Sequence, residues 1–301
     1  MTRILVTAAT GTVGPHVVRE LRSRGAHVRA FVRDPAAAAA TLGDVELAPG
    51  DFDDPASLRR ALDGVDHLYL SAADGHRKVA HETAAIDAAA AAGVKRIVQL
   101  SAMHADTASP LPVFRWHGEA EAHLRRSGVP AVILRPAFFM TNLLMVAGGV
   151  AHTGRLGGPT AGRRIAMIDI RDVAAVAAVK LMEPEPATGS EPETGSPAGT
   201  YELTGPAAVT FADVAAALTE ATGRPVQALD LTEEEARPRF AGAGLPSWLE
   251  EHLVGVFGVI RAGGFERANG HVEAITGHPA RGVGVFARDY AAAFTPADQP
   301  V

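Results

Sequence analysis

The sequence predicts an α/β fold in which a doubly wound parallel sheet is followed by a smaller C-terminal lobe. Two observations carry this prediction. Over the first 135 residues, short apolar runs rich in β-branched residues alternate with Ala- and Leu-rich stretches of helical period, which is typical of βαβ units. The apolar runs are nearly continuous, as in strands that are covered on both faces. Beyond Arg135 the alternation loosens, so the later part of the chain is expected to form the lobe.

The elements of the first part follow from these runs and from the residues that bound them. We expect strands over residues 4–7, 27–32, 45–48, 67–70, 96–100 and 131–134. Between them we expect helices over residues 14–24, 55–62, 79–92 and 113–126. The first helix shows the pattern clearly, because Val13, Val17, Val18 and Leu21 recur at helical spacing and Gly25 follows as a stop signal.

The second part of the chain is less regular. A glycine-rich stretch over residues 148–162 predicts a loop, and residues 183–199, which include no large apolar side chain, predict a flexible surface insertion. The remaining runs predict strands over 165–170, 201–204 and 226–231 and helices over 173–182, 211–222, 233–240 and 247–260. We therefore expect a first domain over residues 1–147 and a lobe mainly over 148–301, with 163–182 and 200–204 returning to the first sheet.

Composition excludes several classes of protein. The chain has no cysteine, which rules out a disulfide scaffold and cysteine-ligated metal centres, and no other metal-ligand pattern is visible. The 34 acidic against 28 basic residues argue against a nucleic-acid partner. No apolar run approaches the roughly 20 residues of a membrane span, and the chain opens on a strand rather than on a leader peptide. We expect a cytoplasmic monomer or homodimer.

The turn after the first predicted strand has the pattern of a dinucleotide-binding loop. Gly11 would let the backbone approach a pyrophosphate, and Gly14 would let the next helix pack close to the sheet. The free N–H groups at the start of that helix favour phosphate. Ala8 departs from the pattern, because a first glycine is usual there. We therefore predict a Rossmann-like domain whose cofactor-binding residues in this turn are Thr7, Ala9, Thr10, Gly11, Thr12 and Val13.

The end of the second predicted strand bears on the type of cofactor. A carboxylate there binds the adenosine ribose of NAD, whereas a basic residue accepts the 2′-phosphate of NADP. Arg33 occupies this place and Asp34 follows it, so NADP(H) is favoured while NAD(H) stays open. The alternative is an ordinary solvated arginine at a strand end.

Several short motifs resemble those of one family. They are Thr7-x-x-x-Gly11-x-x-Gly14, Arg33-Asp34, Gly50-Asp51-Phe52-Asp53-Asp54-Pro55, Ser127-Gly128-Val129 with Ile133-Leu134-Arg135-Pro136, and Asp169-x-x-Asp172. From Thr2 to about Tyr290 the chain resembles the NmrA-like, quinone-reductase-like branch of the atypical short-chain dehydrogenases/reductases. The resemblance implies that NAD(P)H is lined by Asp51 and Phe52 at the adenine, by Ser71, Ala72 and Ala73 along its length, and by Ser101, Pro136 and Phe138 near the nicotinamide.

The catalytic pattern of the short-chain reductases is incomplete in this chain. None of its tyrosines begins a Tyr-x-x-x-Lys motif, and the corresponding positions hold Val113 and His117, followed by Glu121. Imidazole exchanges protons near neutral pH, so we predict His117 as a catalytic residue. Glu121 lies one helical turn further on and is predicted to orient it. The alternative is that His117 only contacts the ribose or caps a polar network.

The acceptor is expected to be a small aromatic molecule. Met and aromatic residues are scarce in the chain, yet several fall in segments expected to face the cofactor, which suggests a flat hydrophobic ligand. The predicted substrate contacts are Met103, Trp116, Phe139, Met140 and His152. The alternative for such a group is simple core packing.

Two kinds of function remain open. One is an NAD(P)H-dependent reductase of a quinone or aromatic polyketide-type substrate whose reduced product then reacts with oxygen, as in antibiotic biosynthesis, with an isoflavone-reductase-like enzyme as a near variant. The other is a non-catalytic NAD(P) sensor of the NmrA type, which the absent tyrosine and lysine favour. No basic or extended docking arm is visible for a protein partner, so the enzyme is the favoured function.

Overall fold

The computed structural model describes residues 2–184, 199–242 and 244–296. The chain divides into two compact units, which are described separately. The first comprises Met1–Pro136 and Ile170–Glu202, and the second comprises Ala137–Asp169 and Leu203–Val301. The domain boundaries expected from the sequence stay predictions. The sequence placed the end of the first domain at residue 147, whereas the first segment of the first compact unit ends at residue 136.

The first unit is built on a mostly parallel sheet. Its strands stand in the order β3-β2-β1-β4-β5-β6-β8, and every pairing from β3 to β6 is parallel. Because β2 and β4 flank β1, the direction of winding reverses beside β1. Open α/β sheets bind ligands at the carboxyl ends of the strands at such a switch point. The strands are β1 (Arg3–Val6), β2 (His27–Val32), β3 (Glu46–Pro49), β4 (His67–Leu70), β5 (Arg96–Leu100), β6 (Ala131–Pro136) and β8 (Gly199–Leu203).

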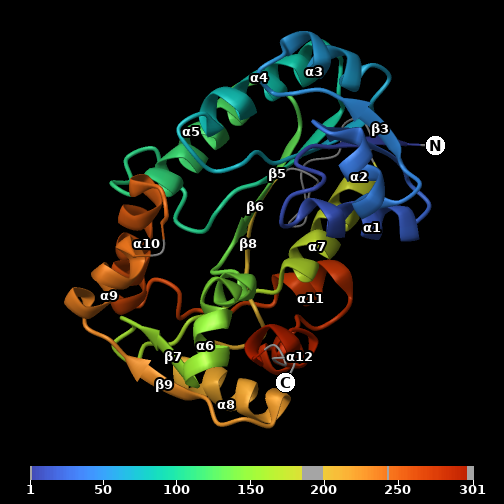
Figure 1. Ribbon diagram of the computed structural model, residues 1–301. Helices are drawn as coiled ribbons and strands as arrows, with labels where there is room; N and C mark the ends of the chain where they lie inside the picture. The colour runs from blue at the N-terminus through green and yellow to red at the C-terminus, as the bar shows by residue number, and fades with distance from the viewer. Residues whose placement is uncertain (1, 185–198, 243, 297–301) are drawn as a thin grey trace. The chain divides into compact units, whose positions relative to one another are not determined.

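Helices cover both faces of this sheet (Figure 1). One face carries α3 (Pro55–Leu62), α4 (Lys78–Ala91) and α5 (Pro112–Arg126), with α4 packed between the other two. The other face carries α1 (Gly14–Ser23), α2 (Pro35–Leu42) and α7 (Ile170–Met182), with α1 packed against both neighbours. The fold predicted from the sequence is confirmed.

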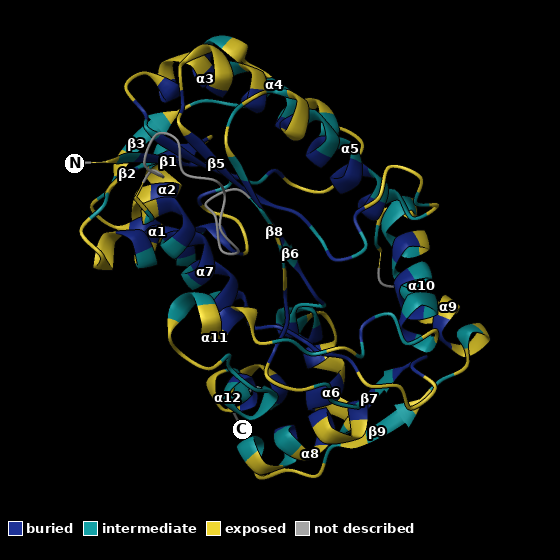
Figure 2. Cartoon of the chain, turned by 180° about the vertical axis from the view of Figure 1, so that it is seen from behind, coloured by how far each residue is buried: buried dark blue, intermediate teal, exposed yellow. Residues whose placement is uncertain are grey.

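One part of the core of the first unit lies between the sheet and the helices α3, α4 and α5. Leu5, Leu68 and Ile97 from the strands are fully buried there against Leu58 and Ile86 from the helices. Strands β1, β2, β4, β5 and β6 are buried along most of their length (Figure 2). This explains why their sequences are continuously apolar, because a strand covered on both faces has no water-facing side.

The second unit is mainly helical around a small parallel pair of strands. Strand β7 (Arg155–Gly158) pairs with β9 (Gln227–Asp230), and α8 (Phe211–Thr222) packs on β9 and on α12 (Val283–Asp289). The other elements are η1 (Met140–Val146), α6 (Ala147–Thr153), α9 (Glu233–Ala241), α10 (Ser247–Arg261), α11 (His271–Thr276) and η2 (Ala291–Phe294). Across the described ranges, no helix is both long and apolar enough to span a bilayer.

Several expectations about local structure are wrong or incomplete, and helices α11 and α12 were not predicted at all. The expected loop over 148–162 contains most of α6 and all of β7. The expected strand over 165–170 is replaced by single bridges, from Ile165 to Val209 and from Ile168 to Phe139, and Ile170 already begins α7. Helix α2 was not predicted, although Asp34 caps it and Pro35 opens it. The expected insertion over 183–199 lies almost wholly outside the described residues.

Candidate functional site

The turn after β1 adopts the backbone expected of a dinucleotide loop despite lacking the first glycine. Ala8 has a φ of 45°, in the left-handed region that an alanine adopts only at some cost. Its carbonyl accepts a hydrogen bond from the N–H of Gly11 at 2.9 Å, which closes the turn. Thr10, Gly11 and Thr12 are exposed, so the turn presents its backbone to a ligand.

The start of α1 requires a glycine and has no side-chain cap. A Cβ on Gly14 would lie 2.1 Å from the carbonyl oxygen of Ala8 and 2.8 Å from the Cα of Ala9. The N-cap residue, Val13, supplies no side-chain hydrogen bond, and the first turn contains no acidic residue. Uncapped N–H groups at the positive end of a helix are a binding site for phosphate.

Thr7 joins this turn to the segment that follows β4. Its hydroxyl donates to the carbonyl of Ser71 at 2.8 Å and accepts from the N–H of Ser71 at 2.9 Å. Thr7 is fully buried, whereas Ser71 is half-buried and Ala73 is exposed. The structure therefore brings the turn and the predicted cofactor-lining residues Ser71, Ala72 and Ala73 together at the switch point.

At the end of β2, Arg33 and Asp34 are neighbours in sequence but differ in their hydrogen bonding. The carboxylate of Asp34 accepts hydrogen bonds from the N–H groups of Ala36 at 2.9 Å and Ala37 at 3.1 Å, so it is engaged as the N-cap of α2. Arg33 is exposed and forms no ion pair with any carboxylate of the described residues. A free guanidinium in this place fits a bound phosphate better than a ribose hydroxyl pair.

Asp51 and Phe52 follow β3 in a turn that is tied down locally. The hydroxyl of Ser57 accepts from the N–H of Asp51 at 3.1 Å. The ring of Phe52 meets Phe31 edge-on at 5.6 Å and stacks on His81 at 5.3 Å between centroids. These contacts leave Phe52 half-buried, a suitable flat surface for a base. Its contact with adenine stays a prediction.

His117 lies on α5 and has a carboxylate neighbour from a different element than expected. Its Nε2 lies 3.5 Å from Oδ1 of Asp74, in the loop that follows the Ser71–Ala73 segment. The ring is buried, and Nδ1 has no hydrogen-bond partner among the described residues. Such an unpartnered buried nitrogen is uncommon in folded proteins, because its desolvation is not offset.

Glu121 does not orient His117, contrary to the expectation from the helical spacing. Its carboxylate accepts from the hydroxyl of Ser101 at 2.5 Å and pairs with Arg135 at 2.6 Å and with Arg125 at 2.9 Å. Both oxygens are thereby occupied, and the side chain is fully buried. Glu121 joins α5 to β6 and to the end of β5, while its direct part in catalysis remains a prediction.

Asp74 belongs to a charged cluster that the sequence did not reveal. Lys78 is 1% exposed, and its ammonium lies 2.9 Å from the carboxylate of Glu82 and 3.3 Å from that of Asp74. Glu82 also accepts from the side chain of Gln99 at 2.8 Å and from the N–H of Ala72 at 3.2 Å. The only sequence signal for this cluster is the i, i+4 spacing of Asp74, Lys78 and Glu82.

The ionisation of the cluster follows from its pairing. Burial alone would raise the pKa of Asp74, but the hydrogen bond with His117 and the charge of Lys78 hold that pKa well below its usual range. Burial lowers the pKa of Lys78, and the charges of Glu82 and Asp74 outweigh it, so that pKa is raised. Both groups are therefore ionised at neutral pH, which keeps a fixed negative charge beside the His117 ring.

Tyr69 cannot take the place of the missing catalytic tyrosine. It is fully buried in β4, and burial, aided by the charge of Glu82, raises the pKa of its hydroxyl. A phenol in this environment is a poor proton donor at neutral pH. Among the tyrosines, the two others lie far along the chain, in β8 and just after α12.

The predicted substrate residues are divided between the two units. In the first, Met103 is buried and its N–H donates to the carbonyl of Pro136 at 2.9 Å, while Trp116 meets His76 edge-on at 5.6 Å. In the second, Met140 is buried, Phe139 is half-buried, and His152 is exposed on α6, while the predicted cofactor contact Phe138 is also half-buried. The contacts of the predicted substrate residues with substrate stay predictions.

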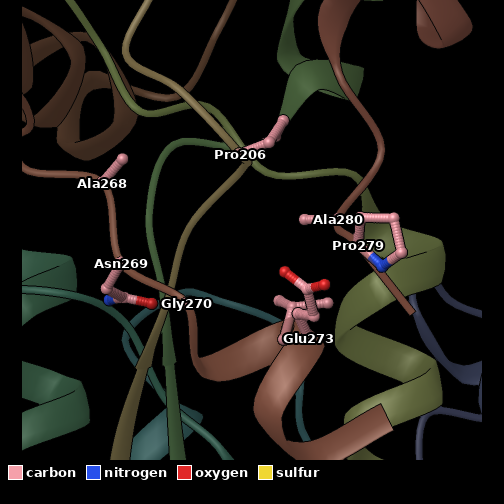
Figure 3. A pocket seen from close by; sticks show the side chains of 8 residues that line it. Pro206, Ala268, Asn269, Gly270, Glu273, Pro279 and Ala280 are labelled. Carbon is pink, nitrogen blue, oxygen red and sulfur yellow. The ribbon is translucent and has the colours of Figure 1, made fainter. Parts of the chain in front are cut away.

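The second unit holds a cavity that none of the predicted substrate residues lines (Figure 3). It has a volume of about 320 Å³, and its wall exposes polar and apolar surface in nearly equal measure. Glu273 from α11 and Asn269 supply its polar side chains. The described residues of the chain contain no group of three His, Asp or Glu side chains arranged to hold a metal ion.

A family model matches the part of the sequence that forms this site. Residues 8–184 match the family described as NAD(P)H-binding, and the chain belongs to that family. The exposed turn, the uncapped start of α1 and the free Arg33 fit the phosphates of a dinucleotide, so the predicted NAD(P)H cofactor is confirmed. The protein is accordingly of the class of NAD(P)H-dependent oxidoreductases.

Comparisons with individual proteins show which oxidoreductases this chain is similar to. An NAD(P)H azoreductase of Xenophilus azovorans is 36% identical over 293 residues, which cover 97% of this chain and 99% of the relative. The crystal structure of an NADPH-dependent quinone oxidoreductase from Escherichia coli, complexed with NADPH, superposes with a TM-score of 0.81 at 31% identity and covers 95% of this chain and 99% of that one. A mutant NmrA shares the fold, with a TM-score of 0.76 at 16% identity over 98% of this chain and 96% of that one. The predicted resemblance to this branch is confirmed.

Proposed function

We propose that the protein is a reductase that uses NAD(P)H, with NADPH preferred, to reduce a planar hydrophobic acceptor such as a quinone or an aromatic polyketide-type compound. The observation that carries the proposal is the buried imidazole of His117. It replaces the lysine of the Tyr-x-x-x-Lys pattern and lies beside Asp74, directly after the predicted cofactor-lining segment. An imidazole held there is a proton source that needs no tyrosine.

The residues that would hold the cofactor are those of the first unit. The exposed turn around Gly11 and the start of α1 would bind the pyrophosphate, and Arg33 would bind the 2′-phosphate. Phe52 would offer a surface to the adenine. Bound NAD(P)H supplies a hydride to the acceptor. The task of the chain is then to orient both reactants, exclude water and deliver one proton.

The proposed type of acceptor agrees with the weak acid catalysis that this chain can provide. A quinone that gains a hydride becomes a hydroquinonate, whose charge is delocalised and which needs one further proton. An alkoxide would need a stronger proton donor, such as the tyrosine that is missing here. The azo bond reduced by the Xenophilus relative is likewise part of a planar conjugated system. We further propose that the reduced product reacts with oxygen, as aromatic polyketide hydroquinones can do.

Consumption of NADPH with a panel of quinones, naphthoquinones and azo compounds tests the proposal. Turnover of at least one acceptor, with a product reduced by two electrons, is expected. A non-catalytic sensor is the competing function, because the structure of the mutant NmrA shares this fold. Tight stoichiometric NADPH binding without turnover of any acceptor would support the sensor and reject the reductase.

Replacing His117 by alanine is expected to lower kcat by at least about tenfold, since positioned proton transfer usually contributes more than this. The affinity for NADPH should stay within about twofold, because none of the phosphate-binding residues is changed. Steady-state kinetics and fluorescence titration of NADPH measure the two effects. An unchanged kcat would remove His117 from the mechanism.

Replacing Arg33 by alanine is expected to weaken NADPH binding by at least about tenfold, or about 1.4 kcal/mol, because a charge-assisted contact with the 2′-phosphate is lost. NADH lacks that phosphate, so its affinity should hardly change. Arg19→Ala is the matched control, since Arg19 is an exposed arginine on α1. Equal losses of NADPH and NADH affinity in Arg33→Ala would contradict the assignment of Arg33 to the phosphate.

A further inference from the structure

We propose that Asp74 is a positioning residue that holds the Nε2–H tautomer of His117, which leaves Nδ1 as the ring atom that exchanges the catalytic proton. The proton-exchange half of this inference rests on the proposed function. The tautomer itself is a property of the free protein and can be tested without turnover.

The geometry selects Asp74 as the carboxylate that acts on His117. Its Oδ1 lies 3.5 Å from Nε2, and the same oxygen lies 3.3 Å from the ammonium of Lys78. The other carboxylate near His117 on α5, Glu121, has both oxygens engaged by Ser101 and two arginines. The ring therefore has one carboxylate partner among the described residues.

Asp74 is anchored so that it can hold a ring in place. Lys78 is almost fully buried, and its ammonium also donates to the carbonyl of Ala72 at 3.2 Å, inside the predicted cofactor-lining segment. Glu82 accepts from the N–H of the same residue. The loop that carries Asp74 is thus pinned to α4 at one side and contacts α5 through His117 at the other, and His76 of the same loop meets the ring of Trp116. Asp74 itself is 43% exposed.

The chemistry of the two partners determines the tautomer. An ionised carboxylate only accepts hydrogen bonds, so the ring nitrogen that faces it must carry a proton. In neutral His117 this proton is on Nε2, and Nδ1 is the bare acceptor that has no protein partner. In protonated His117 both nitrogens carry protons, and the charges of Lys78, Glu82, Asp74 and His117 sum to zero.

The resulting proton step balances. The acceptor gains a hydride, which is two electrons and one proton, and becomes an anion. Protonated His117 gives the Nδ1 proton to that anion and becomes the neutral Nε2–H tautomer, still bonded to Asp74. Nδ1 is shielded from solvent in the free protein, so water restores its proton only when the side chains around the ring move. Asp74 remains ionised throughout and exchanges no proton with the acceptor.

Long-range ¹H–¹⁵N NMR of histidine-labelled full-length protein tests the tautomer directly. The His117 signals are identified by their absence in His117→Gln. In the wild type, the neutral ring is expected to be the Nε2–H tautomer, and in Asp74→Ala the share of the Nδ1–H tautomer should rise. An Nδ1–H tautomer in the wild type, or the same mixture in both proteins, would overturn the proposal whether or not an acceptor is known.

Kinetics with an accepted quinone provide the second test. Asp74→Asn is expected to lower kcat by about tenfold or more with the KM for NADPH within about twofold, and Asp74→Glu should restore part of kcat. In His117→Gln, adding Asp74→Asn should lower kcat no further. A full additional loss in the double variant would show that Asp74 acts independently of His117 and would overturn the proposal.

A matched control is available on the same two helices. Asp87 of α4 pairs with His123 of α5 at 2.7 Å, at positions further along both helices than Lys78 and His117. Asp87→Asn removes an aspartate–histidine pair of the same kind and should leave kcat and the His117 tautomer unchanged. A drop in kcat equal to that of Asp74→Asn would mean that helix packing, and not the His117 tautomer, controls the rate.

Discussion

Replacing Gly14 by alanine is expected to abolish most NADPH binding and to destabilise the first unit. The new Cβ would lie 2.1 Å from the carbonyl oxygen of Ala8, so the turn or the start of α1 must move. Overpacking of this kind typically costs about 1–3 kcal/mol of folding free energy. The displaced groups are the backbone of the turn and the N–H groups of α1, which form the proposed phosphate site. We therefore expect NADPH affinity to fall by at least about a hundredfold, or about 2.7 kcal/mol.

The expected destabilisation by Gly14→Ala is opposite in sign to the usual effect of this substitution in a helix, which makes the test specific. Glycine to alanine within a helix normally stabilises it by about 0.5–1 kcal/mol. Gly148 in α6 has open space around its Cβ position, so Gly148→Ala is the control and should be neutral or stabilising without a change in NADPH affinity. Thermal unfolding and NADPH titration measure both variants. If Gly14→Ala bound NADPH like the wild type, the close approach of turn and helix would have no role in the cofactor site.

Replacing Glu121 by glutamine is expected to produce the largest loss of stability. The carboxylate is 0% exposed and pairs with two arginines while accepting from the Ser101 hydroxyl. Removing one partner of a buried ion pair costs about 3–5 kcal/mol, because the remaining charge is left uncompensated. Arg135 would be the group so affected, since its pKa is raised chiefly by the hydrogen bond with Glu121. Denaturant unfolding of the variant measures the loss.

Glu119→Gln is the matched control on the same helix. Glu119 is 41% exposed and lies 3.9 Å from Arg115, and such surface pairs contribute about 0–1 kcal/mol. A loss of stability in Glu121→Gln no greater than that in Glu119→Gln would show that the buried network is not stabilising. If Glu121→Gln stayed fully stable but lost kcat, the catalytic role originally expected of Glu121 would be favoured over its structural one.

Much of the fold could be predicted because the evidence for it is local in the sequence. The strands of the first unit are mostly continuous apolar runs, and the predicted helices between them are followed by glycines of positive φ that mark their ends, namely Gly25, Gly64, Gly93 and Gly128. The errors lie where this local signal is short or ambiguous. Gly148 and Gly149 favoured a loop, yet they lie in α6, because packing within the second unit outweighs the low helix propensity of glycine. The apolar run over residues 165–170 is buried without forming a ladder.

The candidate site, like the fold, could be predicted only where the evidence for it is local in the sequence. The turn around Gly11 is a contiguous motif, so its position and its class of ligand could be inferred from the residues alone. The carboxylate that contacts His117 could not be inferred from the residues alone. Helical spacing favoured Glu121, but the carboxylate that reaches the ring is Asp74, and Glu121 is held by Arg135 from β6. Contacts between separate elements depend on how these elements pack, which spacing within one helix does not encode.

By itself, the sequence determined the parallel α/β sheet, the glycine turn predicted to bind NAD(P)H and the absence of the Tyr-x-x-x-Lys motif, since each is a property of neighbouring residues. Only the tertiary structure decided which charges meet. It joined Lys78, Glu82, Asp74 and His117 into one cluster beside the predicted cofactor-lining segment, and it engaged Glu121 with Ser101 and two arginines instead of with His117. The physical reason is that buried charges must be neutralised by near neighbours in space, and those neighbours come from different strands, loops and helices.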